Sequence, residues 1–128
     1  MTIRDRDLMP MFTASNRVDG RNVDYQHVWQ QKNLVLVTLA EDDPTATSYA
    51  VSLNGLNASL SSQEAILIIT TTHIEGIPSP GAVVADRWGE VYYVEGASRA
   101  SELPGPDELM KWVQYVRNEC PECQGEAR

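Results

Sequence analysis

Two short apolar segments constrain the fold of this 128-residue chain more than any other feature. Leu34–Ala40 (LVLVTLA) and Ala65–Thr72 (AILIITTT) are nearly continuous runs rich in β-branched side chains. Such runs are typical of central strands that are covered on both faces. Between them, apolar residues recur at helical spacing: Tyr49, Leu53, Leu56 and Leu60. The pattern predicts a β-α-β unit with two buried, parallel strands.

A start signal for the intervening helix precedes this periodicity. Asp43-Pro44 predicts an N-cap aspartate followed by a proline at the first helical position. Asp42 and Asp43 also allow a second interpretation, a carboxylate pair for acid–base chemistry. We favour the cap, because aspartate is preferred at that position without any catalytic function.

The second half of the chain predicts a hairpin and a final helix. Gly81–Asp86 and Glu90–Glu95 are strand-like runs on either side of Arg87–Gly89, where the glycine can close a tight turn. A helix is expected from about Pro106 to Glu119, because a proline and two acidic residues stand at its positive end. Its apolar stripe comprises Leu109, Trp112, Val113 and Val116. The whole order, β-α-β then β-β-α, predicts an α/β fold with a central mixed sheet flanked by helices.

Several motifs along the chain carry a family resemblance. Pro80–Gly89 (PGAVVADRWG) combines a proline, an apolar strand and Asp-x-x-Gly, and Met9–Phe12 and Lys32–Val37 precede it in order. Together they resemble the redoxins, the alkyl hydroperoxide reductase and thiol-specific antioxidant family. The resemblance implies a thioredoxin-like fold. The fold is a reduced version, because the short span between Thr72 and Pro80 leaves no room for the helix that the family usually has there.

The resemblance also implies a site at the N-terminus of the first helix, where free N–H groups and the helix dipole stabilise a thiolate. In the thioredoxin register, the two cysteine positions fall on Asp43 and Ala46. In the peroxiredoxin register, Pro44 stands for the family proline, Ser48 for its threonine and Val51 for its cysteine. Neither register supplies sulfur. The usual active-site cysteines are therefore missing.

A second part of the implied site is Ser79-Pro80. In thioredoxin-like proteins this proline is cis and leaves the preceding backbone free to pair with an extended peptide. The resemblance therefore implies a cis Ser79-Pro80 bond. It also implies a binding groove between this loop and the Asp43-Pro44 corner.

The two cysteines of the chain lie in Cys120-Pro121-Glu122-Cys123. We assign residues 1–119 to the domain and residues 120–128 to a C-terminal tail. Three interpretations of the cysteines stay open: an incidental tail, a zinc or oligomer knuckle, and a redox dithiol. Zinc prefers four ligands, so a second subunit would have to complete the site. Nearby glutamates and the negative end of a helix disfavour a reactive thiolate. Apart from that zinc, we expect no cofactor.

Net charge limits the partners. The formal charge of −8 repels nucleic acid and anionic lipid, so we expect neither as a partner. Charged side chains interrupt the first eleven residues, which predicts neither a signal peptide nor a membrane anchor. We therefore expect a cytoplasmic protein. A protein partner or a second copy of the chain remains in keeping with this charge.

Two functions from different classes follow. The first is a non-catalytic thioredoxin-like module that binds a partner through the groove between Asp43-Pro44 and Ser79-Pro80. The second is a thiol-disulfide or peroxide oxidoreductase whose working sulfurs are Cys120 and Cys123. We favour the binding module, because the chemistry of a fold resides in its site and that site lacks a thiol.

Overall fold

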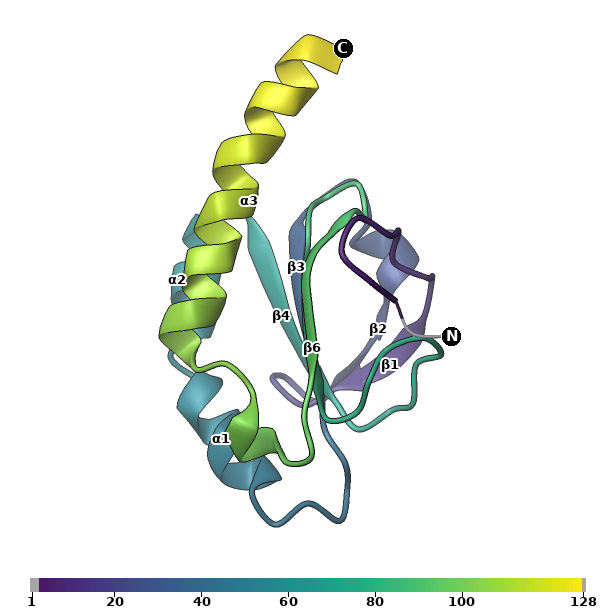
Figure 1. Ribbon diagram of the computed structural model, residues 1–128, viewed down its shortest axis with the longest axis vertical. Helices are drawn as coiled ribbons and strands as arrows, with labels where there is room; N and C mark the ends of the chain where they lie inside the picture. The colour runs from purple at the N-terminus through teal and green to yellow at the C-terminus, as the bar shows by residue number, and fades with distance from the viewer. Residues whose placement is uncertain (1–2, 128) are drawn as a thin grey trace.

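A four-stranded mixed sheet in the order β4-β3-β5-β6 lies at the centre of the computed structural model (Figure 1). The structure describes residues 3–127, and for residues 119–127 it describes the course of the backbone. β3 is parallel to β4 and antiparallel to β5, and β5 is antiparallel to β6. The predicted mixed sheet, with its parallel pair and its hairpin, is confirmed. The strands are β3 (Asn33–Thr38), β4 (Ala65–Thr70), β5 (Gly81–Ala85) and β6 (Val91–Gly96).

The two central strands, β3 and β5, are covered on both faces. The sequence predicted central positions for β3 and β4, and this is correct for β3, whereas β4 lies at the edge of the sheet although five of its six residues are buried. Every residue of β3 and β5 is buried. Alternate side chains of β3 enter two apolar clusters: Val35 and Val37 face the helices, whereas Leu34 and Leu36 face the N-terminal part of the chain. Figure 1 shows this division, with the helices on one face of the sheet and β1, β2 and the N-terminal segment on the other.

The helical segment between β3 and β4 differs from the expectation. It forms two helices, α1 (Ala46–Leu53) and α2 (Leu56–Ser62), rather than one that starts at Asp43-Pro44. The break falls at Asn54-Gly55, two residue types with low helix propensity. The periodicity nevertheless identifies the buried face correctly across the break, since all four apolar residues predicted for it are buried.

The C-terminal helix α3 (Pro106–Ala127) starts where the sequence predicts and ends later. We expected an end near Glu119, but the backbone stays helical to Ala127 and includes Cys120 and Cys123. The segment is rich in Glu and Gln, which favour helix and carry it past the proline. In the predicted apolar stripe, Leu109, Val113 and Val116 are buried. Trp112 is half-buried.

A small N-terminal hairpin closes the β4 edge of the sheet. It consists of β1 (Thr13–Asn16) and β2 (Arg21–Asp24). The buried Asn16 acts like a ladder residue: its Nδ2 donates to Leu67 O at 3.2 Å, and its Oδ1 accepts from Ile69 N at 3.0 Å. One residue further along, the backbone N–H of Arg17 donates to Ile69 O at 2.7 Å. Three outward backbone groups in the middle of β4, Leu67 O, Ile69 N and Ile69 O, are thereby satisfied.

The N-terminal residues 3–9, which we call the strap, run along the opposite edge. The backbone N–H of Arg6 donates to Val91 O at 2.7 Å, and that of Val91 donates to Asp7 O at 2.8 Å. Met9 N donates to Gly89 O at 2.8 Å. The strap therefore pairs with the beginning of β6.

The hairpin between β5 and β6 turns as the Asp-x-x-Gly sequence predicts. Asp86 is buried, and its Oδ1 accepts hydrogen bonds from the backbone N–H groups of Trp88 and Glu90, each at 2.9 Å. Gly89 has φ +88°, in the left-handed region where glycine is least strained. Among the described residues, no helix is long and apolar enough to cross a membrane.

Candidate functional site

The corner at Asp43 follows β3 and precedes α1. Oδ1 of Asp43 accepts hydrogen bonds from Thr45 N at 2.8 Å and from Thr45 Oγ1 at 2.7 Å. Oδ2 accepts from the backbone N–H of Ala100 at 2.7 Å, in the short 3-10 helix η2 (Ala100–Glu102). Both carboxylate oxygens are therefore engaged in holding the corner against η2.

These hydrogen bonds also fix the charge of Asp43. The Thr45 hydroxyl, then the backbone N–H groups of Ala100 and Thr45, hold the pKa of the Asp43 carboxyl below its ordinary value. A carboxylate held ionised in this way is a poor proton donor and a weak base. The N-cap residue of α1 is Thr45, so Asp43 holds the turn before the helix instead of capping it as predicted. Its hydrogen bonds go to Thr45 and Ala100, not to the exposed Asp42.

None of the other positions in the two registers, Ala46, Ser48 and Val51, is a cysteine. Ala46 is buried at the start of α1, and Ser48 is exposed. Val51, which holds the cysteine position of the peroxiredoxin register, points to solvent with 61% of its surface exposed. Val51 is also the sixth residue of α1, so the peroxiredoxin register does not put its cysteine position at the helix N-terminus as expected. Neither register therefore offers a thiolate at the start of α1.

The Ser79-Pro80 loop has the cis peptide bond that the resemblance implies. Ser79 is exposed and Pro80 is buried. The loop is fixed at both ends: Thr38 Oγ1 donates to Pro78 O at 2.5 Å, and Ala97 N donates to Pro80 O at 3.1 Å. The loop is therefore anchored to the carboxyl end of β3 and to the segment after β6.

Two glycines let this loop lie close to the sheet. A Cβ added at Gly81 would lie 2.3 Å from Pro78 O, and one at Gly96 would lie 2.8 Å from Pro78 Cβ. Any side chain at these positions would displace the loop.

The two parts of the implied site lie at the same end of the sheet but share no hydrogen bond. Asp43 is bonded to Thr45 and Ala100, whereas the Ser79-Pro80 loop is bonded through Thr38 and Ala97. Both follow from β3, since its last residue contacts the loop and the corner comes soon after it. The residues at these two places, Asp43, Pro44, Ser79 and Pro80, supply no soft nucleophile.

The structure does not describe the side chains of the cysteine pair, so it tests no site there. Cys120 and Cys123 lie on the helical backbone of α3, but their side chains are outside the described residues. Within the part of the chain that the structure describes, no group of three His, Cys, Asp or Glu side chains could hold a metal ion. His27 and His73 are both exposed. The three interpretations of the cysteines stay predictions.

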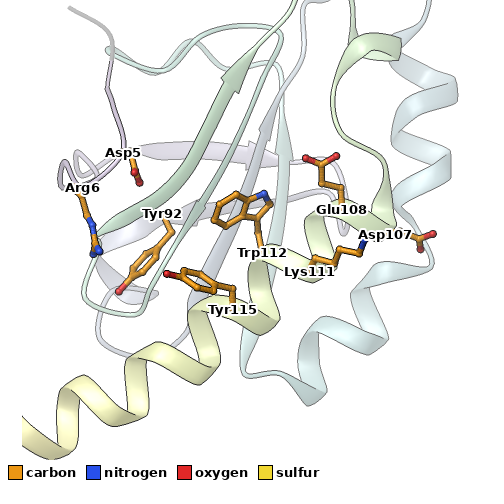
Figure 2. Close-up of a pocket in the computed structure, with 8 residues that line it drawn as sticks. All are labelled: Asp5, Arg6, Tyr92, Asp107, Glu108, Lys111, Trp112 and Tyr115. Carbon is orange, nitrogen blue, oxygen red and sulfur yellow. The ribbon is translucent and has the colours of Figure 1, made fainter.

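A feature that the sequence did not reveal is a cavity of about 750 Å³ between the strap, β6 and α3 (Figure 2). None of the implied site positions lines it. A signal was present, because Trp112 and Tyr115 are three residues apart on α3 and so lie on one side of the helix. Nothing in the sequence brings that side to the strap. The lining residues are Asp5, Arg6, Tyr92, Asp107, Glu108, Lys111, Trp112 and Tyr115.

Aromatic rings in and beside the cavity hold one another in place. Trp112 stacks on Tyr93 with the ring centres 5.0 Å apart, and Tyr115 meets Trp112 edge-on at 5.8 Å. Tyr92 meets Tyr115 edge-on at 6.0 Å. The guanidinium of Arg6 lies 5.1 Å from the centre of the Tyr92 ring. These contacts connect α3, β6 and the strap into one wall.

Comparison with solved structures finds the same architecture. A reduced 2-Cys peroxiredoxin from Plasmodium vivax matches with a TM-score of 0.70 and 11% identity, over 89% of this chain and 82% of that one. AhpC from Mycobacterium tuberculosis matches with a TM-score of 0.67 and 10% identity, over 93% and 96% of the two chains.

A thioredoxin-family thiol:disulfide interchange protein from Chlorobium tepidum TLS matches with a TM-score of 0.64 and 12% identity, over 91% of this chain and 99% of that one. No protein-family model and no curated protein matches the sequence. At such identities the similarity extends to the fold alone. The chain has the thioredoxin-like fold found in peroxiredoxins.

Proposed function

We propose that this chain is a non-catalytic thioredoxin-like binding module. It holds an extended segment of a partner protein between the Asp43-Pro44 corner and the Ser79-Pro80 loop. The observation that carries the proposal is the Asp43 carboxylate, which is bonded to Thr45 and Ala100 where the resemblance would place a reactive sulfur. A corner closed by an ionised carboxylate positions backbone without offering a nucleophile.

The partner is a protein segment, or a second copy of this chain, rather than a polyanion. The net charge of −8 opposes nucleic acid and anionic lipid.

Binding through the loop is tested with a matched pair of variants. Reduced and carbamidomethylated α-lactalbumin, whose blocked cysteines carry no added charge, serves as the extended chain, and its binding is followed through the backbone amide signals of the isotope-labelled protein. We expect the Ser79 amide to shift, Ser79→Ala to leave binding unchanged, and Ser79→Pro to weaken it by removing the N–H group. Should Ser79→Pro fail to fold, the Ser79 amide of the unchanged protein decides. Shifts confined to other surfaces would refute the proposal.

An oxidoreductase is the second candidate, favoured by the similarity to structures described as peroxiredoxins and a thiol:disulfide interchange protein. Its sulfurs would be Cys120 and Cys123. The module proposal predicts that the protein reduces insulin disulfides or hydrogen peroxide no faster than the double variant Cys120→Ser/Cys123→Ser, because no other side chain offers a low-pKa thiol. A robust rate that Cys120→Ser abolishes would replace the module with the oxidoreductase.

A further inference from the structure

The cavity between the strap, β6 and α3 is separate from the proposed peptide site. Its volume of about 750 Å³ lies within the ordinary range of small-molecule sites. Its walls come from three distant parts of the sequence, so it exists only in the folded chain. Figure 2 shows a row of rings, with Asp5 and Arg6 at one end and Glu108 and Lys111 at the other.

The rings in this cavity are already ordered to receive a ligand. Tyr92 and Trp112 are each held by edge-on contact with Tyr115, and Tyr93 stacks on Trp112 from outside the cavity. Tyr115 keeps 46% of its surface exposed, so part of the wall remains open to a ligand. The face of an aromatic ring carries negative partial charge and attracts cations, most strongly for tryptophan.

Charge around the rings favours a cation further. Three carboxylates line the cavity, those of Asp5, Asp107 and Glu108, against two cationic side chains. One of the cations is already paired, because Arg6 binds Glu90 at 2.7 Å. The other, Lys111, extends beside Asp107 and away from the row of rings (Figure 2). An anionic ligand would therefore meet both the carboxylates and the negative charge of the whole chain.

We propose that this cavity binds an organic cation, an alkylated ammonium group attached to an apolar body, against Trp112 and Tyr115 and beside Glu108. An inorganic cation would keep its water shell and gain little from the rings. An alkylated ammonium has a weakly hydrated surface, which can contact ring faces while a carboxylate neutralises its charge. The site is independent of the peptide groove, so either can fail without the other.

The experiment compares choline with 3,3-dimethylbutan-1-ol, its uncharged carbon analogue of the same shape. Binding is measured at constant ionic strength from the indole N–H signal of Trp112, which the spectrum of Trp112→Phe assigns. We expect choline to bind at least roughly tenfold more tightly than the alcohol, as a desolvated cation–π contact would give. Equal binding of the two compounds, or no shift of the Trp112 signal with either, would overturn the proposal.

Variants locate the site. Glu108→Gln should weaken choline binding several-fold, whereas Glu41→Gln, which removes an exposed charge outside the cavity, should leave it unchanged. Tyr115→Leu removes a half-exposed ring and should abolish the preference for choline over the alcohol. Circular dichroism checks that each variant is folded. Equal effects of Glu108→Gln and Glu41→Gln would reduce the cavity to part of a general negative surface and refute a specific site.

Discussion

Two buried tyrosines in this chain have opposite surroundings. The Tyr49 hydroxyl donates to Pro104 O at 2.6 Å and so ties α1 to the segment before α3. The Tyr25 hydroxyl is buried without a hydrogen-bond partner in the described structure, and burial, followed by the charge of Asp86, raises the pKa of Tyr25 to about 12. A phenol without a partner adds nothing that a phenyl ring would lack.

Removing each of the two hydroxyls should have a different effect on stability. Tyr49→Phe should lower the free energy of unfolding by about 1–2 kcal/mol, because it leaves a buried carbonyl without its donor. Tyr25→Phe should leave stability unchanged or raise it by up to about 1 kcal/mol. Urea unfolding monitored by circular dichroism measures both. An equal loss in the two variants would show that Tyr25 has a partner in solution.

Asp43 predicts a pH-dependent contribution to stability. Its folded-state pKa lies below the ordinary value of 3.8, so the ionised form stabilises the fold above that pH and the contribution is lost as the pH falls through the lowered pKa. Asp43→Ala should therefore lower the melting temperature by a few degrees at pH 7. The difference from the unchanged protein should shrink below about pH 4.

The control for this prediction is Asp42→Ala, since Asp42 is the exposed neighbour of the same charge. It should shift the melting temperature little at either pH. If both variants lose the same stability at pH 7, the bonds from Asp43 to Thr45 and Ala100 contribute nothing, and the corner is held by packing alone.

At the scale of single elements, the clamp from β1 to β4 depends on one side chain. Asn16→Ala would leave Leu67 O and Ile69 N without partners at a buried edge. We expect a loss of about 2–4 kcal/mol in the free energy of unfolding, measured by urea titration. Asn22→Ala, on the exposed neighbouring strand, should cost less than about 0.5 kcal/mol. Similar costs for both would mean that water replaces the Asn16 amide.

The elements themselves were predictable from the sequence where local pattern determines them. β3 and β4 follow from their continuous apolar runs, and the β5–β6 turn follows from Asp86 and Gly89. The break between α1 and α2 falls at Asn54-Gly55, because these two residues have low helix propensity, although the helical spacing of apolar residues continues on both sides. Helix ends were less predictable. We expected α3 to end near Glu119, but helix-favouring residues follow that position and the helix continues to Ala127.

The candidate sites also differ in how far local sequence determines them. Asp43 was predicted as the helix N-cap from its local sequence, but the N-cap of α1 is Thr45, and Asp43 binds the amide and hydroxyl of Thr45 from the turn before it. Its bond to Ala100 and the cavity beside Tyr92 both join segments far apart in the chain. No local pattern encodes such contacts, since they depend on how the strap and α3 meet around β6.

For the whole molecule, the boundary of the folded unit can be tested by truncation. Val116 is the last side chain of α3 that the described structure buries. Deleting residues 120–128 should therefore leave the melting temperature within about 2 °C of the full chain, by calorimetry, with the sheet intact. Failure of the shortened chain to fold would move the domain boundary past residue 119.

Measurements on the full chain separate the three interpretations of the cysteines. If Cys120 and Cys123 hold zinc across a two-fold axis, metal analysis of the full chain should find about half an equivalent per chain, and a chelator should convert dimer to monomer. If they form a redox pair, mild oxidant should abolish thiol reactivity without changing size, and a reductant should restore it. An incidental tail predicts neither response.

The two edges of the sheet differ in a way that limits how copies could polymerise. At one edge, Asn16 and Arg17 bind three outward backbone groups of β4, Leu67 O, Ile69 N and Ile69 O. At the other edge, the strap pairs with β6 around Val91. Continuous growth through backbone hydrogen bonds requires every copy to offer two open edges, one to receive a strand and one to extend the array. Because the hairpin occupies these groups of β4, we expect a strand from another copy to pair more readily at the far end of β6, which would join two sheets and stop there. We therefore expect removal of the small N-terminal hairpin to expose this edge and to favour fibre formation.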